Sequence, residues 1–545
     1  MKKLFLAAIA TFLCAGAFAI DDPVQYVNPL VGSHSTHGLS TGNTYPAIAL
    51  PWGMNFWTPQ TGKMGDGWCY TYDAEKIRGF KQTHQPSPWM NDYAMFNIMP
   101  EAGDAPVYDE DRRASWFSHK AEVSKPHYYK VYLADYDITT EIAPTSRAAI
   151  FRFTCAEGRN FVIVDAFDRG SYVKVIPGEN KVVGYTTRNS GGVPEGFKNY
   201  FVLQFDRPFT YTSTASDGKE SKALEQKSSH AAAAVGFQMR RGEQVNVRVA
   251  SSFISIEQAE QNLKELGSRT LEEVAEAGRQ EWNKVLSVID VDDPSDVDRL
   301  RTFYSCLYRS TLFPRSFYEV NARGEVVHYS PYNGQVLPGY LFADTGFWDT
   351  FRALFPLVNL MYPGMSQKMQ EGWANAFKES GFLPEWSAPG HRACMVGNNS
   401  ASVVADAYLK GIRGYDIDAL WEAVTHGANA DLPHTTSGRK QWQTYNRLGY
   451  VPYDSINESA ARTLEYAFDD WSIYKLGQAL GKPEKEIKVY AEHAMNYKNL
   501  FDKSHNLMRG KLANGEWAPN FNPFKWGDAF TEGNSWHYSW SVFHD

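Results

Sequence analysis

The period of the hydrophobic pattern changes once along this chain, near residue 256, and this change restricts the possible folds. Before it, apolar residues alternate with polar ones, as in the run of Val245, Val247 and Val249. A period of two places these side chains on one face of a sheet. Short runs of this kind, separated by turns rich in Gly, Asn and Asp, predict a β-sandwich over residues 20–255.

The pattern beyond this point is typical of helices. Residues 256–293 are rich in Glu, Ala, Gln, Leu and Lys, and they predict a helical linker. The next helix is expected to begin at Pro294-Ser295, where Ser295 and Asp298 have the spacing of a capping box. Residues 294–545 are therefore expected to form a helical domain. The predicted fold class is multidomain β + α, with an N-terminal sandwich, a linker and a helical domain.

The first residues have the features of a cleaved signal peptide. A positive start, Met1-Lys2-Lys3, precedes an apolar run that is too short to span a bilayer, and Ala17-Phe18-Ala19 supplies a small-x-small cleavage pattern. Residues 1–19 are therefore predicted to be the signal peptide. No later stretch approaches 18 uninterrupted apolar residues, so we expect an exported protein without a transmembrane segment, periplasmic or at the cell surface in a bacterium.

Composition excludes several classes of function. The 54 Lys and Arg residues against 62 Asp and Glu residues give a net charge of −8 without a basic block, which argues against nucleic-acid binding. Patterns of P-loop, dinucleotide-binding, zinc-protease and G-x-S-x-G hydrolase sites are absent. The remaining cysteines, Cys69, Cys155, Cys306 and Cys394, lack metal-ligand spacing and are expected to be buried free thiols. The 14% of aromatic residues suit either a large core or a sugar-binding cleft.

One glutamate has the surroundings that suit a general acid. Glycoside hydrolysis needs two carboxyl groups that flank the scissile bond, one of them protonated. Apolar or aromatic walls favour the protonated form. Glu532 is the best candidate, because Gly533-Asn534 bends the chain after it, before the next helix, and several aromatic residues surround it in sequence: Phe521, Phe524, Trp526, Phe530 and Trp536. The alternative is a solvated loop glutamate.

Other candidate residues lie in three further segments. Asp349 and Arg352, in Phe347-Trp348-Asp349-Thr350-Phe351-Arg352, are three apart, so they could bind a sugar or form a structural ion pair on one helical face. His84 and Trp89 belong to a proline-stiffened loop that suits either a binding-site wall or a structural turn. Asp469-Asp470 places paired acids within a helix, where the helix surface is the more common location.

Taken together, these segments resemble the family 92 glycoside hydrolases, which are calcium-dependent exo-acting α-mannosidases. The resemblance follows family order along nearly the whole mature chain. The matching segments are Tyr26-Val27-Asn28-Pro29-Leu30-Val31-Gly32, Gly79-Phe80 with Thr83-His84, Trp348-Asp349-Thr350-Phe351-Arg352, Gly381-Phe382-Leu383-Pro384-Glu385-Trp386, Ala405-Asp406-Ala407-Tyr408, Thr463-Leu464-Glu465-Tyr466-Ala467 with Asp469-Asp470-Trp471, and Thr531-Glu532-Gly533-Asn534.

The resemblance implies a β-sandwich packed on an (α/α)6 barrel, with the active site between them. It also implies an inverting mechanism, with Glu532 as general acid and with Trp89, Asp349, Arg352 and His84 as substrate-binding residues. Ca2+ is the implied cofactor, and mannose-containing glycans are the implied partners. The Gln85-Pro86-Ser87-Pro88-Trp89 loop is similar to that of members that cleave α-1,2 linkages.

The sequence departs from the family pattern after Glu532. The general base of the family is expected from a downstream D-D-x-G motif, which this sequence does not contain. We therefore expect a C-terminally truncated chain with an incomplete barrel, and a general base and calcium ligands that lie outside it. Two alternatives stay open: a glycan-binding protein without catalysis, and another inverting (α/α)6 glycosidase.

Overall fold

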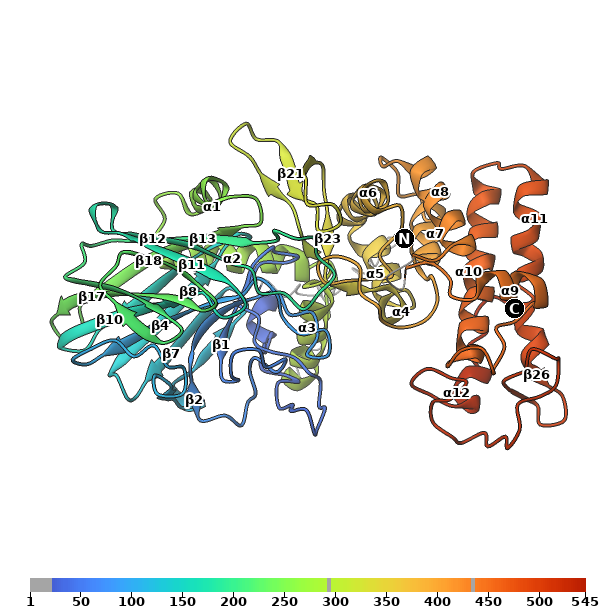
Figure 1. Cartoon of the computed structure of the whole chain (residues 1–545), viewed down its shortest axis with the longest axis horizontal. Coiled ribbons are helices and arrows are strands. Elements are labelled where there is room, and N and C mark those ends of the chain that lie inside the picture. The colour runs from blue at the N-terminus through green and yellow to red at the C-terminus, as the bar shows by residue number, and fades with distance from the viewer. Residues whose placement is uncertain (1–21, 292–295, 433–436) are drawn as a thin grey trace, which may run out of the picture.

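A computed structural model describes residues 22–291, 296–432 and 437–545. Within these ranges a β-rich domain is followed by a helical domain, and the two lie side by side along the longest axis of the molecule (Figure 1). This order confirms the predicted fold class. The predicted signal peptide, residues 1–19, and the predicted helix start at Pro294-Ser295 lie outside the described residues.

The β-rich domain contains two large sheets in which neighbouring strands run antiparallel. Among the described residues the first sheet has seven strands, in the spatial order β1 (Phe56–Gln60), β3 (Gly79–Thr83), β4 (Phe96–Ala102), β10 (Gly158–Asp165), β17 (Ala231–Met239), β14 (Tyr211–Ser216) and β15 (Lys219–Ser221). Over the same described ranges the second has nine: β16 (Glu225–Ser228), β11 (Ser171–Ile176), β12 (Lys181–Thr186), β13 (Asn199–Phe205), β18 (Gln244–Ser252), β9 (Ala148–Thr154), β8 (Ile138–Pro144), β7 (Tyr128–Leu133) and β6 (Val123–Lys125).

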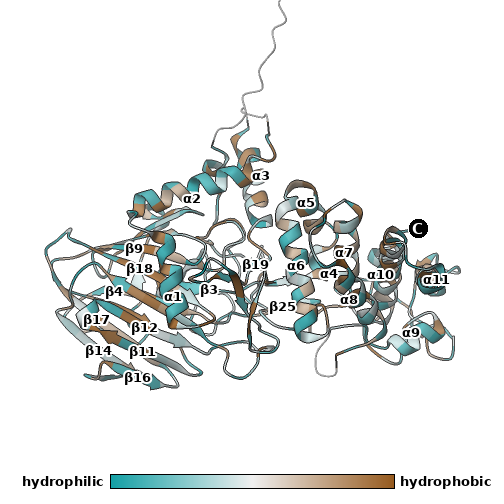
Figure 2. Ribbon diagram, turned by 90° about the horizontal axis from the view of Figure 1, so that it is seen from above, coloured by the Kyte–Doolittle hydropathy of each residue, from teal (hydrophilic) through white to brown (hydrophobic). Residues whose placement is uncertain are grey.

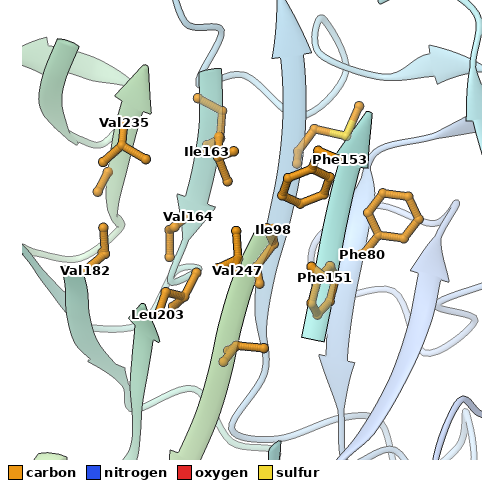
Figure 3. Packing of buried hydrophobic residues seen from close by; sticks show 14 of the residues in the cluster. Phe80, Ile98, Phe151, Phe153, Ile163, Val164, Val182, Leu203, Val235 and Val247 are labelled. Carbon is orange, nitrogen blue, oxygen red and sulfur yellow. The ribbon is translucent and has the colours of Figure 1, made fainter. Parts of the chain in front are cut away.

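The two sheets pack face to face around one hydrophobic core. Phe96 of β4 and Phe201 of β13 stack with ring centroids 4.4 Å apart. Trp57 of β1 meets the edge of Phe151 of β9 at 4.9 Å. Figure 3 shows further members of this core, which includes Val247 from the alternating run on β18. The side chains predicted to share one sheet face therefore point into the sandwich.

The predicted linker is helical, but it is docked on the sandwich and does not span open space. α1 (Ile256–Leu263) packs on β18 and β13, and α2 (Leu271–Leu286) packs on β8 and β9. Figure 2 shows many hydrophilic residues on α1, whereas β4 and β17 are largely hydrophobic. Both helices begin at side-chain caps, because Ser255 and Thr270 accept hydrogen bonds from backbone N–H groups of the first turn.

The helical domain begins with α3 (Val297–Ser310), whose N-cap is Asp296, with Oδ1 accepting from Arg299 N at 3.1 Å. The other helices are α4 (Phe347–Thr350), α5 (Leu354–Met361), α6 (Pro363–Ser380), α7 (Ser400–Leu409), α8 (Ile417–Asn429), α9 (Trp442–Leu448), α10 (Ser459–Ala479), α11 (Glu484–His493) and α12 (Ser535–Ser539). No helix in the described ranges is long and apolar enough to cross a bilayer.

Short strands and 3-10 helices complete the chain. The strand groups are β2 (Lys76–Ile77) with β5 (Ser115–Trp116), β19 (Arg315–Ser316) with β23 (Phe342–Ala343), β20 (Glu319–Val320) with β21 (Val326–Tyr329) and β22 (Val336–Pro338), β24 (Thr345–Gly346) with β25 (Trp386–Ser387), and β26 (Phe501–Asp502) with β27 (Leu507–Met508). The 3-10 helices are η1 (Pro23–Tyr26), η2 (His119–Ala121), η3 (Pro177–Glu179), η4 (Lys264–Leu266) and η5 (Asn496–Leu500).

The four described cysteines are all free thiols. Cys69 and Cys155 are buried, as expected, but Cys306 is exposed and Cys394 is half-buried. The expectation was wrong for Cys306 because this residue lies on the outward face of α3, whose buried face carries Leu300, Tyr304 and Leu307.

The paired acids of α10 are buried, and the expectation that they lie on a helix surface was wrong. α10 packs against α7, α8 and α11, so little of its surface reaches solvent. Asp470 forms an ion pair with Arg439 at 2.7 Å and accepts a hydrogen bond from the Tyr445 hydroxyl at 2.9 Å. A buried carboxylate needs such partners, because an unpaired charge in the interior is very costly.

The N-terminus of α7 is surrounded by buried carboxylates. Asp469 accepts from Asn398 N at 2.9 Å, and Glu385 accepts from Ser400 N at 3.1 Å and from the Ser400 hydroxyl. Negative groups are favourable here because the helix dipole is positive at this end. Burial nevertheless raises the pKa of Glu385 to about 7, with the Ser400 hydrogen bonds opposing the shift.

We expect Glu385→Gln to remove a pH dependence of stability. The native pKa lies above that of an exposed glutamate, so wild type loses stability as pH rises from about 4.5 through 7. The free energy of unfolding of the variant, relative to that of wild type, should therefore rise by up to about 3 kcal/mol between pH 5 and pH 8. Urea unfolding at both pH values measures this difference. The control is Glu516→Gln at an exposed position, and an equal pH response of both variants would contradict the interpretation.

Candidate active site

A cavity of about 540 Å3 lies where the sandwich meets the helical domain. Figure 1 shows β23 and α4 at this junction. The walls come from segments far apart in the sequence: Pro86, Ser87, Trp89 and Met90 from the loop after β3, Arg309 in the last turn of α3 and Phe313 after it, Asp344, Thr345, Gly346, Asp349, Thr350 and Leu354 around α4, Trp386, Cys394 and Met395 from β25 and the loop after it, and Glu532 before α12.

Trp89 is a large exposed side chain in this wall, with 62% of its surface accessible. Its ring makes T-shaped contacts with Trp68, whose centroid lies 5.0 Å away, and with His37, whose centroid lies 5.9 Å away. An indole fixed in this way can offer its π face to the C–H groups of a sugar ring, which carry partial positive charge. The structure thus brings Trp89 to the cavity, as the sequence predicted.

The loop that carries Trp89 is anchored at its base by a buried ion pair. Lys81 Nζ and Asp92 lie 2.8 Å apart, and both side chains are inaccessible to solvent. Asp92 also accepts from the backbone N–H of His84 at 2.9 Å and from the Thr83 hydroxyl at 2.8 Å. These bonds close the loop, so the position of Trp89 follows from buried contacts.

His84 lies in this buried base and does not line the cavity. Its ring nitrogens contact Tyr93 O at 3.0 Å and Asn55 Oδ1 at 3.2 Å. Burial lowers the pKa of His84 to about 3, so the ring is neutral. The structure does not support the predicted substrate contact, because both nitrogens are used inside the protein. His84 is a residue that positions the loop.

Asp349 projects from α4 into the cavity, where its carboxylate is accessible. Trp386, which the sequence did not single out as a site residue, donates its indole N–H to Asp349 Oδ2 at 3.1 Å. Partial exclusion of water raises the pKa of Asp349, the Trp386 bond opposes this, and the charge of Glu532 raises it further. The two carboxyl groups are therefore electrostatic neighbours in one cavity.

Arg352 does not pair with Asp349, contrary to the alternative based on their spacing. Its guanidinium binds Glu465 Oε1 at 2.7 Å and lies over the Phe351 ring at 4.2 Å. The first turn of α4 directs Asp349 toward Trp386 and leaves Arg352 facing α10. Arg352 does not line this cavity, so the structure does not support direct substrate binding by Arg352 here.

Glu532 stands at the mouth of the cavity on a strained turn. Its φ is +46°, in the left-handed region that residues with a Cβ rarely adopt. Bonds on both sides hold the turn: the Tyr538 hydroxyl donates to Thr531 O at 2.7 Å, and Gly527 N donates to Gly533 O at 2.8 Å. Strain of this kind, of order 1–3 kcal/mol, is typical of functional sites.

The predicted aromatic enclosure of Glu532 is wrong for the described residues. Glu532 itself is exposed, and Phe524, Trp526 and Trp536 expose 71%, 64% and 46% of their surfaces. The predicted bend is confirmed, because Asn534 caps α12 by accepting from Trp536 N and His537 N. Glu532 is not buried by its aromatic neighbours in sequence, because Phe524, Trp526 and Trp536 are themselves largely exposed to solvent.

Asp344 is a further carboxylate in the cavity wall that sequence reasoning missed. Its Oδ2 accepts from Arg315 Nε at 2.7 Å and from the Tyr93 hydroxyl at 3.0 Å. Its Oδ1 is buried without a hydrogen-bond partner. The only sequence signal was its place three residues before Phe347-Trp348-Asp349, which did not distinguish it from a turn residue.

Comparison with known proteins agrees with this architecture. Residues 26–252 match the model of the glycosyl hydrolase family 92 N-terminal domain, and residues 258–545 match that of the family 92 catalytic domain. A curated relative, an uncharacterized secreted glycosidase of Arthroderma benhamiae, is 24% identical over 560 residues. That alignment covers 93% of this chain, which spans about two thirds (66%) of the relative's length.

Solved structures give the same result. The family GH92 inverting mannosidase BT2199 from Bacteroides thetaiotaomicron VPI-5482 is 44% identical, with a TM-score of 0.94 over 96% of this chain and 71% of that one. The α-mannosidase BT3965 of the same bacterium, in complex with mannoimidazole, is 27% identical, with a TM-score of 0.86 over 96% of this chain and 70% of that one. Since the two family models together span almost the whole described chain, this protein belongs to glycosyl hydrolase family 92.

Proposed function

We propose that this protein is an exo-acting α-mannosidase that releases terminal α-linked mannose from mannans or N-glycans. The observation that carries the proposal is the convergence of Trp89, Asp349 and Glu532 on one cavity, although they come from three separate segments. They supply a stacking face, an acceptor for sugar hydroxyls and a carboxyl group at the mouth. The relatives support the same assignment, because both solved structures are described as mannosidases.

In the proposed reaction Glu532 donates a proton to the glycosidic oxygen as the bond breaks. A water molecule attacks the anomeric carbon from the opposite face, which inverts the configuration. Asp349, held by Trp386, orients the mannose ring through its hydroxyl groups. Asp344 is engaged by Arg315 and Tyr93, so it is a poor base for that water. The proposal assigns no general base among the described residues.

The loop that carries Trp89 supports a preference for α-1,2 linkages. Pro86, Ser87 and the exposed Trp89 line the cavity, where they can contact the sugar next to the cleaved bond. Gln85 is buried and bonds to Gly67 O, so it fixes this loop without a direct contact with substrate. The predicted signal peptide and the description of the relative as secreted support an exported location, in the periplasm or at the cell surface.

The anomer of the first product tests the mechanism. Proton NMR during hydrolysis of an α-mannoside should show β-mannose before mutarotation, because a single displacement inverts the anomeric carbon. α-Mannose as the initial product would rule out this mechanism.

Glu532→Gln tests the assignment of the acid. We expect kcat for an alkyl α-mannoside to fall by about 10²–10⁴-fold, since general acid catalysis contributes this much. The loss should be far smaller for 2,4-dinitrophenyl α-mannoside, whose leaving group departs without a proton. Glu516→Gln, an exposed change in the same domain, is the control. Equal losses for both substrates would show that Glu532 is not the acid.

We also propose that the enzyme requires Ca2+. Calcium prefers oxygen ligands, and the unpartnered Oδ1 of Asp344 is an oxygen of this kind in the cavity wall. However, the described residues contain no group of three or more His, Cys, Asp or Glu side chains that could hold a metal ion. These side chains therefore do not form a complete calcium site by themselves, and no step above depends on the ion.

Chelation tests this requirement. Treatment with EDTA should abolish mannoside hydrolysis, and Ca2+ should restore it where Mg2+ does not, because Mg2+ demands a smaller octahedral site. Full activity after exhaustive chelation would contradict the proposal.

A glycan-binding protein without catalysis is the second candidate. It is favoured by one observation: of the carboxylates in the cavity wall, Asp344 is engaged by Arg315 and Tyr93, and Asp349 is held by Trp386. The assays above separate the two functions, since this candidate binds mannosides and releases no mannose.

A further inference from the structure

A second cavity, of about 310 Å3, lies in the β-sandwich domain next to Trp89. Its walls come from residues 35–37, from six residues between Thr61 and Thr71, and from Arg78. His37, Lys63 and Asp66 are exposed around it, and Trp68 is half-buried in it. Its volume lies at the lower end of the roughly 300–1,000 Å3 that is typical of ligand pockets.

This cavity and the candidate active site share an aromatic wall. Trp68 and His37 line the second cavity, and their ring centroids lie 5.0 Å and 5.9 Å from that of Trp89, which lines the first. The loops are also bonded to each other, because Asn91 Nδ2 donates to Gly65 O at 3.2 Å and Gln85 Nε2 donates to Gly67 O. A chain of sugars that leaves the mouth at Trp89 therefore meets Trp68 next.

The polar groups of the second cavity suit a neutral, hydroxyl-rich ligand. Trp68 is fixed by its backbone N–H, which donates to Asp66 Oδ1 at 2.9 Å, and by its indole N–H, which donates to Asn43 Oδ1 at 3.2 Å. The two cations, Lys63 and Arg78, already bind Asp111 at 2.7 Å and 2.9 Å. Because the carboxylates of Asp66 and Asp111 balance these two cations, the cavity has little excess charge to attract a phosphate.

We propose that this cavity is a subsite for the leaving glycan, in which a sugar beyond the cleaved bond packs on Trp68 and bonds to the polar groups around it. The proposal rests on the proposed function, since it takes the mouth near Glu532 as the point of cleavage. It would make affinity depend on glycan length as well as on the terminal mannose.

Binding of two probes by isothermal titration calorimetry tests the subsite, and Glu532→Gln without a second change takes the place of wild type so that neither probe is hydrolysed. Methyl α-mannoside reaches only the first cavity, whereas linear α-1,2-mannotriose extends beyond it. Thr36→Trp, which places a bulky ring in the second cavity from an exposed position, should weaken binding of the trisaccharide about tenfold, or about 1.4 kcal/mol, and leave methyl α-mannoside unchanged. Trp68→Ala should weaken binding of the trisaccharide at least as much, and it should also weaken binding of methyl α-mannoside because Trp68 packs against Trp89. Trp116→Ala, at a distant tryptophan of similar type with 45% exposure, is the control.

The outcomes separate the two proposals. Binding of the trisaccharide by Glu532→Gln no tighter than that of methyl α-mannoside, or further variants that bind both probes as Glu532→Gln does, would overturn the subsite. Loss of trisaccharide binding in both variants, in a protein that does not recognise methyl α-mannoside, would support the subsite and overturn the mannosidase assignment. Failure of Glu532→Gln to bind either probe would overturn both.

Discussion

A buried ion pair between Arg315 and Asp344 joins the two domains beneath the cavity, and the site depends on it. Both side chains are fully inaccessible, and their closest atoms lie 2.7 Å apart. Arg315 also donates to Met54 O and lies 3.7 Å from the Phe56 ring, while Tyr93 donates to Asp344. Met54, Phe56 and Tyr93 belong to the sandwich. Removal of either charge would leave the other buried and unpaired, a cost of about 3–5 kcal/mol.

The same principle recurs around the cavity, where exposed groups stand on buried supports. Trp89 is accessible, but its loop is closed by Lys81 and Asp92. Asp349 is accessible, but Trp386 holds its carboxylate. Glu532 is accessible on a turn tied down by backbone and tyrosine hydrogen bonds. Because these buried contacts already hold the exposed side chains in place, little conformational entropy is lost when a substrate binds. A few side chains can therefore position the substrate.

Sequence reasoning reached the fold class and three of the cavity residues, but not their partners. The pattern at Val245, Val247 and Val249 predicted a strand correctly because alternation is a local property of the backbone. The i, i+3 spacing of Asp349 and Arg352 suggested a pair, yet Arg352 binds Glu465, which is 113 residues away. Nothing in the neighbouring sequence identified Asp344 or Trp386 as a site residue, since each acquires its role from a residue on another element.

The sequence by itself determined the order of a β-rich and a helical domain and the segments that carry Trp89, Asp349 and Glu532. Periodicity, helix caps and turn residues depend only on residues a few positions apart, so they can be recognised in the sequence alone. Only the tertiary structure decided that β9 and β10, neighbours in the chain, belong to different sheets, that His84, Asp469 and Asp470 are buried, and that Glu532 is exposed. Burial and charge pairing depend on distant residues that meet only after folding.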